Sequence, residues 1–273
     1  MKIFIDSADI DEIKAAFSWG FIDGVTTNPS LIKKAAEKYG AKNLENYVSS
    51  VLAAVGHNHD VSLEVLGGSF QAMIQQGKVL YNKFSGVGAK VVVKIPVNPL
   101  LKPNDNADVE YDGIRAINVL AKEGIPVNTT LVMAPEQALL AAKAGAKYVS
   151  PFAGRIDDFV RDCCSCNYKK TDYFPQEGIK IRPDEILDDN GIVSGVDLVA
   201  KIVQIFRNYG LKAEVLAASV RNARQVRELA LAGAHISTIP FDVLAQMVRH
   251  EKTYEGMQKF TADIVPEYRA LFD

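Results

Sequence analysis

The chain contains 273 residues, 48% hydrophobic and 23% charged, the composition of an ordinary globular protein with a sizeable core. Its formal net charge of −2 argues against a general nucleic-acid binder or a protein drawn to anionic membranes, but does not exclude a local basic pocket for a small anion. No run approaches the ~18 consecutive apolar residues of a membrane-spanning helix, and the N-terminus lacks the features of a secretion signal.

Eight short apolar runs, rich in β-branched residues, alternate with segments of helical periodicity along the chain. The predicted strands are Lys2–Asp6, Gly24–Thr27, Val61–Val65, Lys90–Ile95, Pro126–Leu131, Tyr148–Pro151, Ala213–Ala218 and Ala234–Ile239. The predicted helices include Asn43–Val55, Glu110–Glu123, Pro135–Ala144, Val196–Tyr209 and Ala223–Ala232. Continuous apolar strands separated by helices are typical of a parallel sheet that is buried on both faces.

This pattern predicts an α/β fold, a single (β/α)₈ TIM barrel in which residues 1–273 form one domain. The alternative is an open doubly wound sheet, but the Gly-x-Gly-x-x-Gly turn typical of it is absent after the first strand. Four helices are expected to end at a glycine before the next strand, at Gly124, Gly145, Gly210 and Gly233.

Two connections are longer than the rest, residues 98–108 after the fourth strand and residues 155–195 after the sixth. Both join a strand to the following helix, so both are expected on the C-terminal face of the barrel, where barrel enzymes have their active sites. Long loops in this position often form lids or substrate walls.

Charged and hydrogen-bonding side chains recur near the C-terminal ends of the predicted strands. They are Asp6, Thr27, Asn28, Glu64, Lys94, Asn128, Thr130, Ser150, Arg155, Ser219 and Arg221. Because all barrel strands open toward one mouth, we expect these side chains to share one pocket.

Lys94 lies in the run Val91–Pro96, which is otherwise suited to a barrel interior. An unpaired buried ammonium is costly, so such a lysine either pairs with a carboxylate or loses its proton. A neutral lysine amine is the nucleophile that Schiff-base chemistry requires. The alternative is a structural ion pair with Asp6 or Glu64.

Seven segments, in order and spread over the chain, resemble the transaldolase family. They are Phe4–Ala8, Thr26–Ile32, Val93–Pro96, Asn128–Val132, Ser150–Asp157, Ala217–Asn222 and Thr238–Pro240. The resemblance implies a (β/α)₈ barrel and a metal-free aldol mechanism acting on sugar phosphates.

The resemblance also implies catalytic roles for four residues. Lys94 would form an imine with a ketose, and Asp6 would take the proton of the C4 hydroxyl as the C3–C4 bond breaks. Glu64 and Thr130 would hold the water that shuttles protons. Asp6 alone could equally be a core carboxylate paired with Lys94.

Eight further residues are expected to bind the substrate. The residues expected at the three-carbon unit are Asn28, Asn128 and Ser62. The residues expected at the terminal phosphate, where guanidinium groups and hydroxyls fit the oxygens, are Arg155, Arg221, Ser150 and Ser219. Phe152 bears on the type of reaction, because transaldolases resemble this chain in having Glu at position 64 and Phe at position 152, whereas fructose-6-phosphate aldolases typically have Gln and Tyr there.

The resemblance therefore favours a transaldolase that passes a dihydroxyacetone unit from sedoheptulose 7-phosphate to glyceraldehyde 3-phosphate. The alternatives are an aldolase that releases free dihydroxyacetone and a non-catalytic sugar-phosphate binder. Two departures from the family are Val220, where Phe is common, and the two enlarged connections.

The three cysteines, Cys163, Cys164 and Cys166, are odd in number and lie in one segment, which favours reduced thiols over a disulfide framework. The cluster has too few ligands for a closed four-cysteine zinc site, and no histidine lies near it in the sequence. We therefore expect a cytoplasmic protein with no metal or other cofactor; the alternative is a metal-binding or redox-sensing cluster.

The segment Tyr254–Phe272 has the apolar spacing of an amphipathic helix. The family resemblance suggests that this helix packs over a barrel mouth, on a neighbouring subunit of a homo-oligomer.

Overall fold

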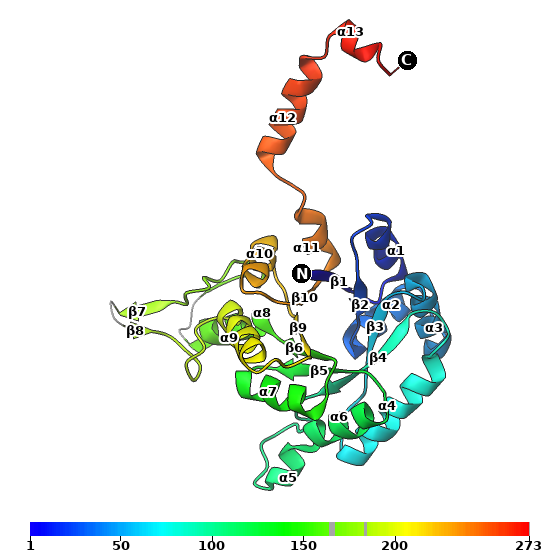
Figure 1. The fold of residues 1–273 in the computed structure, drawn as a ribbon, viewed down its shortest axis with the longest axis vertical. Helices are drawn as coiled ribbons and strands as arrows, with labels where there is room; N and C mark the ends of the chain where they lie inside the picture. The colour runs from blue at the N-terminus through cyan, green and yellow to red at the C-terminus, as the bar shows by residue number, and fades with distance from the viewer. Residues whose placement is uncertain (164–166, 183–184, 273) are drawn as a thin grey trace.

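The computed structural model describes residues 1–163, 167–182 and 185–272. Eight parallel strands close into a barrel in the order β1-β10-β9-β6-β5-β4-β3-β2 (Figure 1). The barrel strands are β1 (Lys2–Asp6), β2 (Gly24–Thr26), β3 (Asp60–Glu64), β4 (Lys90–Pro96), β5 (Val127–Val132), β6 (Tyr148–Pro151), β9 (Glu214–Ala217) and β10 (Ile236–Ile239). The predicted barrel is confirmed, and the bounds of each predicted strand agree to within two residues.

Helices surround the barrel (Figure 1). Those before the long connection are α1 (Ile10–Ser18), α2 (Pro29–Lys38), α3 (Leu44–Val55), α4 (Phe70–Phe84), α5 (Ala107–Glu110), α6 (Asp112–Lys122), α7 (Pro135–Ala144) and α8 (Ala153–Cys163). Those after it are α9 (Gly195–Asn208), α10 (Ala223–Leu231), α11 (Phe241–Gln246), α12 (Glu251–Ala262) and α13 (Pro266–Arg269). The four predicted terminal glycines all have positive φ, for example 103° at Gly145, the left-handed conformation that ends a helix.

The core has two parts. Most buried apolar side chains fill the space between the barrel and the helices. A smaller cluster fills the barrel itself with Phe4, Val92, Tyr148, Leu216 and Ile236, all 3% exposed or less. Gly24 on β2 makes room for Phe4, because a Cβ at Gly24 would lie 2.6 Å from the Phe4 Cζ atom. The barrel interior is thus a packed core.

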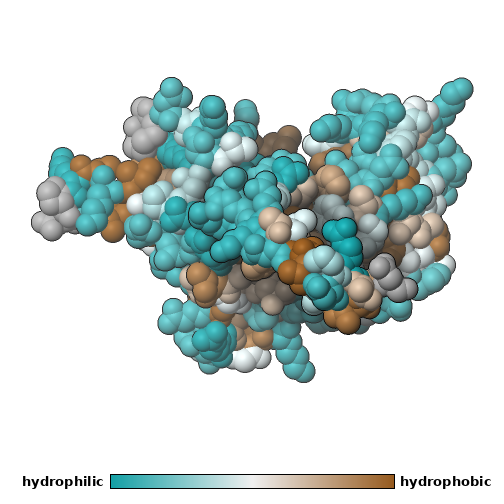
Figure 2. Space-filling view, turned by 90° about the horizontal axis from the view of Figure 1, so that it is seen from above, coloured by the Kyte–Doolittle hydropathy of each residue, from teal (hydrophilic) through white to brown (hydrophobic). Residues whose placement is uncertain are grey.

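The two enlarged connections occur where they were predicted. The first runs from β4 to the short helix α5, and Asn98 within it donates a hydrogen bond to Glu110 of that helix. The second is not a plain loop, because α8 follows β6 almost at once and a two-stranded hairpin, β7 (Lys180–Arg182) and β8 (Glu185–Ile186), comes later. The hairpin forms an arm that projects from the barrel, with apolar and hydrophilic residues both at its surface (Figures 1 and 2).

Cys163, at the end of α8, is a free and exposed thiol. Cys164 and Cys166 lie outside the described residues, so the expectation of a reduced thiol cluster stays a prediction. Within the described ranges, no helix is long and apolar enough to cross a membrane.

The C-terminal segment forms two helices rather than one, since α12 ends at Ala262 and Pro266 starts α13. The segment extends away from the barrel (Figure 1), and neither helix has a buried residue. Its exposed apolar side chains are Tyr254, Met257, Phe260, Ile264, Val265, Tyr268, Leu271 and Phe272. A single copy of the chain therefore leaves this apolar surface uncovered.

Candidate active site

A polar cavity of about 190 Å³ opens at the C-terminal ends of the barrel strands. Its lining residues are Asp6, Thr26, Asn28, Lys94, Phe152, Arg155, Ala218, Ser219, Arg221 and Thr238. Seven of the twelve residues expected at the site therefore share one cavity, as the convergence of barrel strands predicts.

Strand register fixes the position of Lys94. On β4 it lies between Glu64 of β3 and Asn128 of β5. Its residue exposure is 5%, and its Nζ atom lies 2.9 Å from Glu64 Oε2. The Nζ also donates to the carbonyl oxygen of Thr27 at 3.2 Å. The amine is thus held inside the barrel by one carboxylate and one carbonyl, with the open cavity beside it.

Asp6, at the end of β1, is held by a chain of two hydroxyls. Thr26 Oγ1 donates to Asp6 Oδ1 at 2.7 Å and lies 2.5 Å from Thr238 Oγ1. Burial raises the pKa of Asp6 above its usual range, while the Lys94 ammonium and the Thr26 hydrogen bond offset part of that rise. The arrangement supplies a carboxyl group whose proton affinity is increased, which suits a group that takes and returns a proton.

Thr26, Ala218 and Thr238 were not among the expected site residues. All three belong to segments that carry the family resemblance, but their types gave no separate chemical signal. The register of β1 against its two neighbours was the missing information, because β2 pairs Thr26 with Asp6, and β10 pairs Thr238 with Phe4.

Three of the expected substrate-binding residues form a buried hydrogen-bonded row across the barrel. Asn128 Nδ2 donates to Ser62 Oγ at 3.1 Å, and Ser150 Oγ donates to Asn128 Oδ1 at 2.7 Å. These residues are almost completely buried and do not line the cavity. Thr130 is also fully buried, and its Oγ1 has no hydrogen-bond partner within the described chain. A water bound beside Thr130 would satisfy that hydroxyl.

Asn28 joins the cavity to a helix. Its side-chain oxygen accepts a hydrogen bond from the Leu31 N–H at 3.0 Å and so caps the N-terminus of α2. This bond fixes the amide plane and leaves the Nδ2 group to donate toward a ligand in the cavity.

Two guanidinium groups lie on the side of the cavity formed after β6 and β9. Arg155 is exposed and lies over the Phe152 ring, 5.0 Å from its centroid. Arg221 is partly buried and donates to Asp158 Oδ2 at 2.8 Å. Ser219, which also lines the cavity, has a φ of 61°, an uncommon conformation for a residue other than glycine. Arg155, Arg221 and the Ser219 hydroxyl together can bind a phosphate group.

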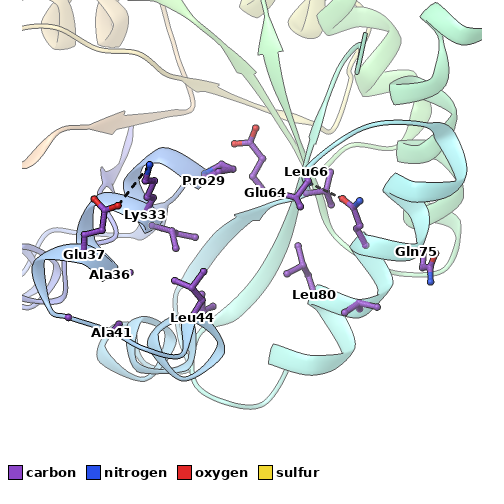
Figure 3. Close-up of a pocket in the computed structure, with 16 residues that line it drawn as sticks. Pro29, Lys33, Ala36, Glu37, Ala41, Leu44, Glu64, Leu66, Gln75 and Leu80 are labelled. Carbon is purple, nitrogen blue, oxygen red and sulfur yellow. Dashed lines mark hydrogen bonds and ion pairs between the residues drawn. The ribbon is translucent and has the colours of Figure 1, made fainter. Parts of the chain in front are cut away.

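A larger cavity, about 800 Å³, lies outside the barrel between α2, α3 and α4. In Figure 3, Leu44 and Leu80 lie on opposite sides of it, and Glu64 is at its rim. Most of its lining is apolar, from residues such as Ile32 and Val79. A groove with few converging polar groups does not suit a sugar phosphate, so the smaller polar cavity is the candidate active site.

The comparisons with known proteins agree with this geometry. The family model described as Transaldolase/Fructose-6-phosphate aldolase matches residues 3–272. A probable transaldolase of Anaeromyxobacter sp. (strain K) is 39% identical over 263 residues, which cover 96% of each chain. A probable transaldolase of Hydrogenobaculum sp. (strain Y04AAS1) is 40% identical over 263 residues, again 96% of each chain. One from Thermoplasma acidophilum is 39% identical over 266 residues, 96% of this chain and 95% of that protein. The chain is therefore an enzyme of the transaldolase/fructose-6-phosphate aldolase family.

Proposed function

We propose that the protein is a transaldolase that moves a dihydroxyacetone unit between sugar phosphates through a Schiff base on Lys94. The observation that carries the proposal is the buried Lys94 amine in one cavity with the Asp6 carboxyl and two guanidinium groups. The reaction would convert sedoheptulose 7-phosphate and glyceraldehyde 3-phosphate into erythrose 4-phosphate and fructose 6-phosphate. It would place the enzyme in the pentose phosphate pathway of the cytoplasm.

The proposed sequence begins when Glu64, 2.9 Å from Nζ, accepts a proton from the Lys94 ammonium, and the amine attacks the C2 carbonyl of the ketose. Water leaves as the imine forms. The water that we place beside the Thr130 hydroxyl relays protons during these steps.

The protonated imine then acts as an electron sink. Asp6 takes the proton of the C4 hydroxyl, the electrons of the C3–C4 bond move into the imine, and an aldose phosphate leaves. The three-carbon enamine stays on Lys94 until its carbon attacks the carbonyl of an acceptor aldose, when Asp6 returns the proton. Hydrolysis of the new imine releases the product ketose.

We propose that Asn28 binds the hydroxyls of the three-carbon unit through its free amide group. Ser62 and Asn128, hydrogen-bonded to each other on the two strands that flank β4, would support that end of the cavity from within the barrel. Arg155, Arg221 and Ser219 would bind the terminal phosphate. The Ser150 hydroxyl is engaged with Asn128, so we assign Ser150 to the support of Asn128 rather than to direct phosphate contact.

Glu64 and Phe152 support transfer over release of dihydroxyacetone. An aldolase acting through the same imine is the second candidate, supported by the family description, which covers both activities. Incubation with fructose 6-phosphate, with and without erythrose 4-phosphate, separates the two. We expect turnover that depends on the acceptor; equal turnover without it would establish the aldolase instead.

The Schiff base is tested by reduction with borohydride in the presence of fructose 6-phosphate, followed by mass mapping of peptides. We expect a covalent adduct on Lys94 and none in the Lys94→Met variant. A variant that is still labelled would place the nucleophile elsewhere. A wild-type protein that binds fructose 6-phosphate but is not trapped would favour a non-catalytic binder.

We also propose that the enzyme is a homo-oligomer. A single copy leaves two apolar surfaces uncovered, the C-terminal segment α12–α13 and the groove between α2, α3 and α4. Contiguous exposed apolar surface is typical of an interaction site. Light scattering is expected to give a mass that is a multiple of 29.8 kDa, and a monomeric mass would exclude the assembly.

A further inference from the structure

Within the enlarged connection between β6 and α9, residues 171–174 pack beside the segment that follows Arg221. Most of the described part of this connection is exposed, but Phe174 is only 3% exposed and belongs to the main core. The residues just before it, Thr171, Asp172 and Tyr173, therefore follow a fixed path over the barrel surface. They lie against the segment that follows Arg221.

Two contacts join this path to that segment. Asn222 Nδ2 donates to the Thr171 carbonyl oxygen at 3.2 Å. The Arg224 guanidinium lies over the Tyr173 ring, 3.6 Å from its centroid, a close cation–π contact. A third contact comes from α8, where Arg161 donates to the Asp172 carbonyl oxygen at 2.8 Å. The path is thus attached both to α8 and to the start of α10.

The segment that receives these contacts needs support. The left-handed φ of 61° at Ser219 costs free energy, and such a conformation persists only where the surroundings hold it. From inside, the Arg221 N–H donates to Gln225 Oε1 at 2.8 Å, and Gln225 Nε2 donates to Asp157 Oδ2 at 2.7 Å. The enlarged connection adds the contacts of Thr171 with Asn222 and of Tyr173 with Arg224.

The Asn222 side chain makes hydrogen bonds both to α10 and to the enlarged connection. Its Oδ1 accepts from the Gln225 N–H at 2.9 Å and caps α10, while its Nδ2 is the group bound to Thr171. The single amide therefore ties the enlarged connection to Gln225, which in turn holds the backbone of Arg221.

We propose that residues 171–174 of the enlarged connection position the loop Ser219–Asn222 and thereby set the enzyme's affinity for phosphate. These residues touch no reacting atom; they act through Asn222 and Arg224 on Arg221. Lys94 is held by Glu64 and Thr27 on the other side of the barrel, so imine formation does not depend on this support. The inference rests on the proposed function, since it takes Arg221 as a phosphate ligand.

The test separates phosphate affinity from imine formation. Tyr173→Ala removes the ring beneath Arg224, and its control Ile181→Ala alters an exposed side chain of the same connection, in the hairpin. Tyr173→Ala is expected to raise KM for fructose 6-phosphate about five-fold and to weaken binding of inorganic phosphate in calorimetry to a similar extent. Its kcat, and borohydride trapping with unphosphorylated dihydroxyacetone, are expected to equal the wild-type values.

Two further variants guard against simple misfolding. Tyr173→Phe keeps the ring and should retain wild-type phosphate affinity. Arg224→Lys keeps the charge but loses the stacked planar group, and should raise KM for fructose 6-phosphate in the same direction as Tyr173→Ala. Phosphate affinity and KM in Tyr173→Ala and Arg224→Lys that match those of Ile181→Ala would overturn the proposal.

The proposed function fails by a different result. A wild-type protein that is not trapped with dihydroxyacetone would remove the Schiff base, whatever the variants at position 173 do. A wild-type protein that is trapped, but whose affinity for phosphate is unchanged by both Tyr173→Ala and Arg224→Lys, would refute only the role of residues 171–174.

Discussion

The hydroxyl chain that ends on Asp6 gives a quantitative prediction. Thr26→Val keeps the shape of the side chain but removes the donor that lies 2.7 Å from Asp6 Oδ1. Because that hydrogen bond favours the ionised carboxylate, its loss should raise the pKa of Asp6 beyond the rise that burial already causes.

The size of the shift follows from the charge on the acceptor. A hydrogen bond to a charged group contributes about 1.5–3 kcal/mol, and one pKa unit corresponds to about 1.4 kcal/mol. The pKa of Asp6 should therefore rise by about 1–2 units in Thr26→Val. Thr238→Val removes only the donor behind Thr26, and cooperative strengthening of roughly 10–30% per bond predicts a rise of a few tenths of a unit.

The assay is the pH dependence of kcat/KM, whose acid limb reports the essential base of the free enzyme. Because Asp6 would lose its proton at a higher pH, the acid limb of the profile should shift to higher pH in Thr26→Val. The shift should be smaller in Thr238→Val and very small in the control Thr26→Ser, which keeps the hydroxyl. The kcat/KM at high pH should recover most of the wild-type value. If Thr26→Val lowers kcat/KM equally at every pH, the hydroxyl chain does not act through the protonation of Asp6.

Three further variants test the fold, the electrostatics and the assembly. Gly24→Ala places a Cβ against the packed Phe4 ring and should lower the free energy of unfolding in urea by about 1–3 kcal/mol. Adding Phe4→Leu to this variant should restore part of that loss. A double variant whose loss equals the sum of the two single losses would contradict the steric explanation. Burial raises the pKa of Asp157 from 3.8 to about 7, so the native state holds a proton that the unfolded state has lost. The free energy of unfolding of the wild-type protein, measured in urea, should therefore fall as the pH rises from 3.8 to about 7. Asp157→Asn should lack this part of the pH dependence, and the same pH dependence in both proteins would refute the explanation. Removal of residues 251–273 should lower the number of subunits measured by light scattering without loss of barrel stability, since α12 and α13 bury no side chain. An unchanged number of subunits would place the interface elsewhere.

The barrel was predictable because its signal is repeated eight times. Each strand is a short apolar run that must be buried on both faces, and each helix shows its own periodicity, so errors of one residue at a boundary leave the architecture unchanged. The division of the C-terminal segment into two helices was missed, although Pro266 marks the break in the sequence. The prediction that residues 1–273 form one domain stays a prediction.

The site was predictable to the extent that its side chains carry distinctive chemistry. A lysine in the apolar run of β4 is unusual wherever the strand lies, so Lys94 was evident without the structure. Threonines in β-strands are common, so Thr26 and Thr238 became informative only when strand register placed them beside Asp6. The burial of Ser62, Asn128 and Ser150 in a closed row depends on three strands at once and could not be read from any one segment.

The two ends of the cavity are held in place by different means. Lys94 and Asp6 are fixed by strand register, which cannot change without moving every neighbouring side chain of a packed barrel. Arg221 is fixed by a loop whose conformation depends on contacts with α8 and with residues 171–174. An enlarged connection can therefore alter phosphate recognition while the imine-forming end stays the same. Through the proposed support, this segment is where substrate length and affinity can change without loss of the underlying reaction.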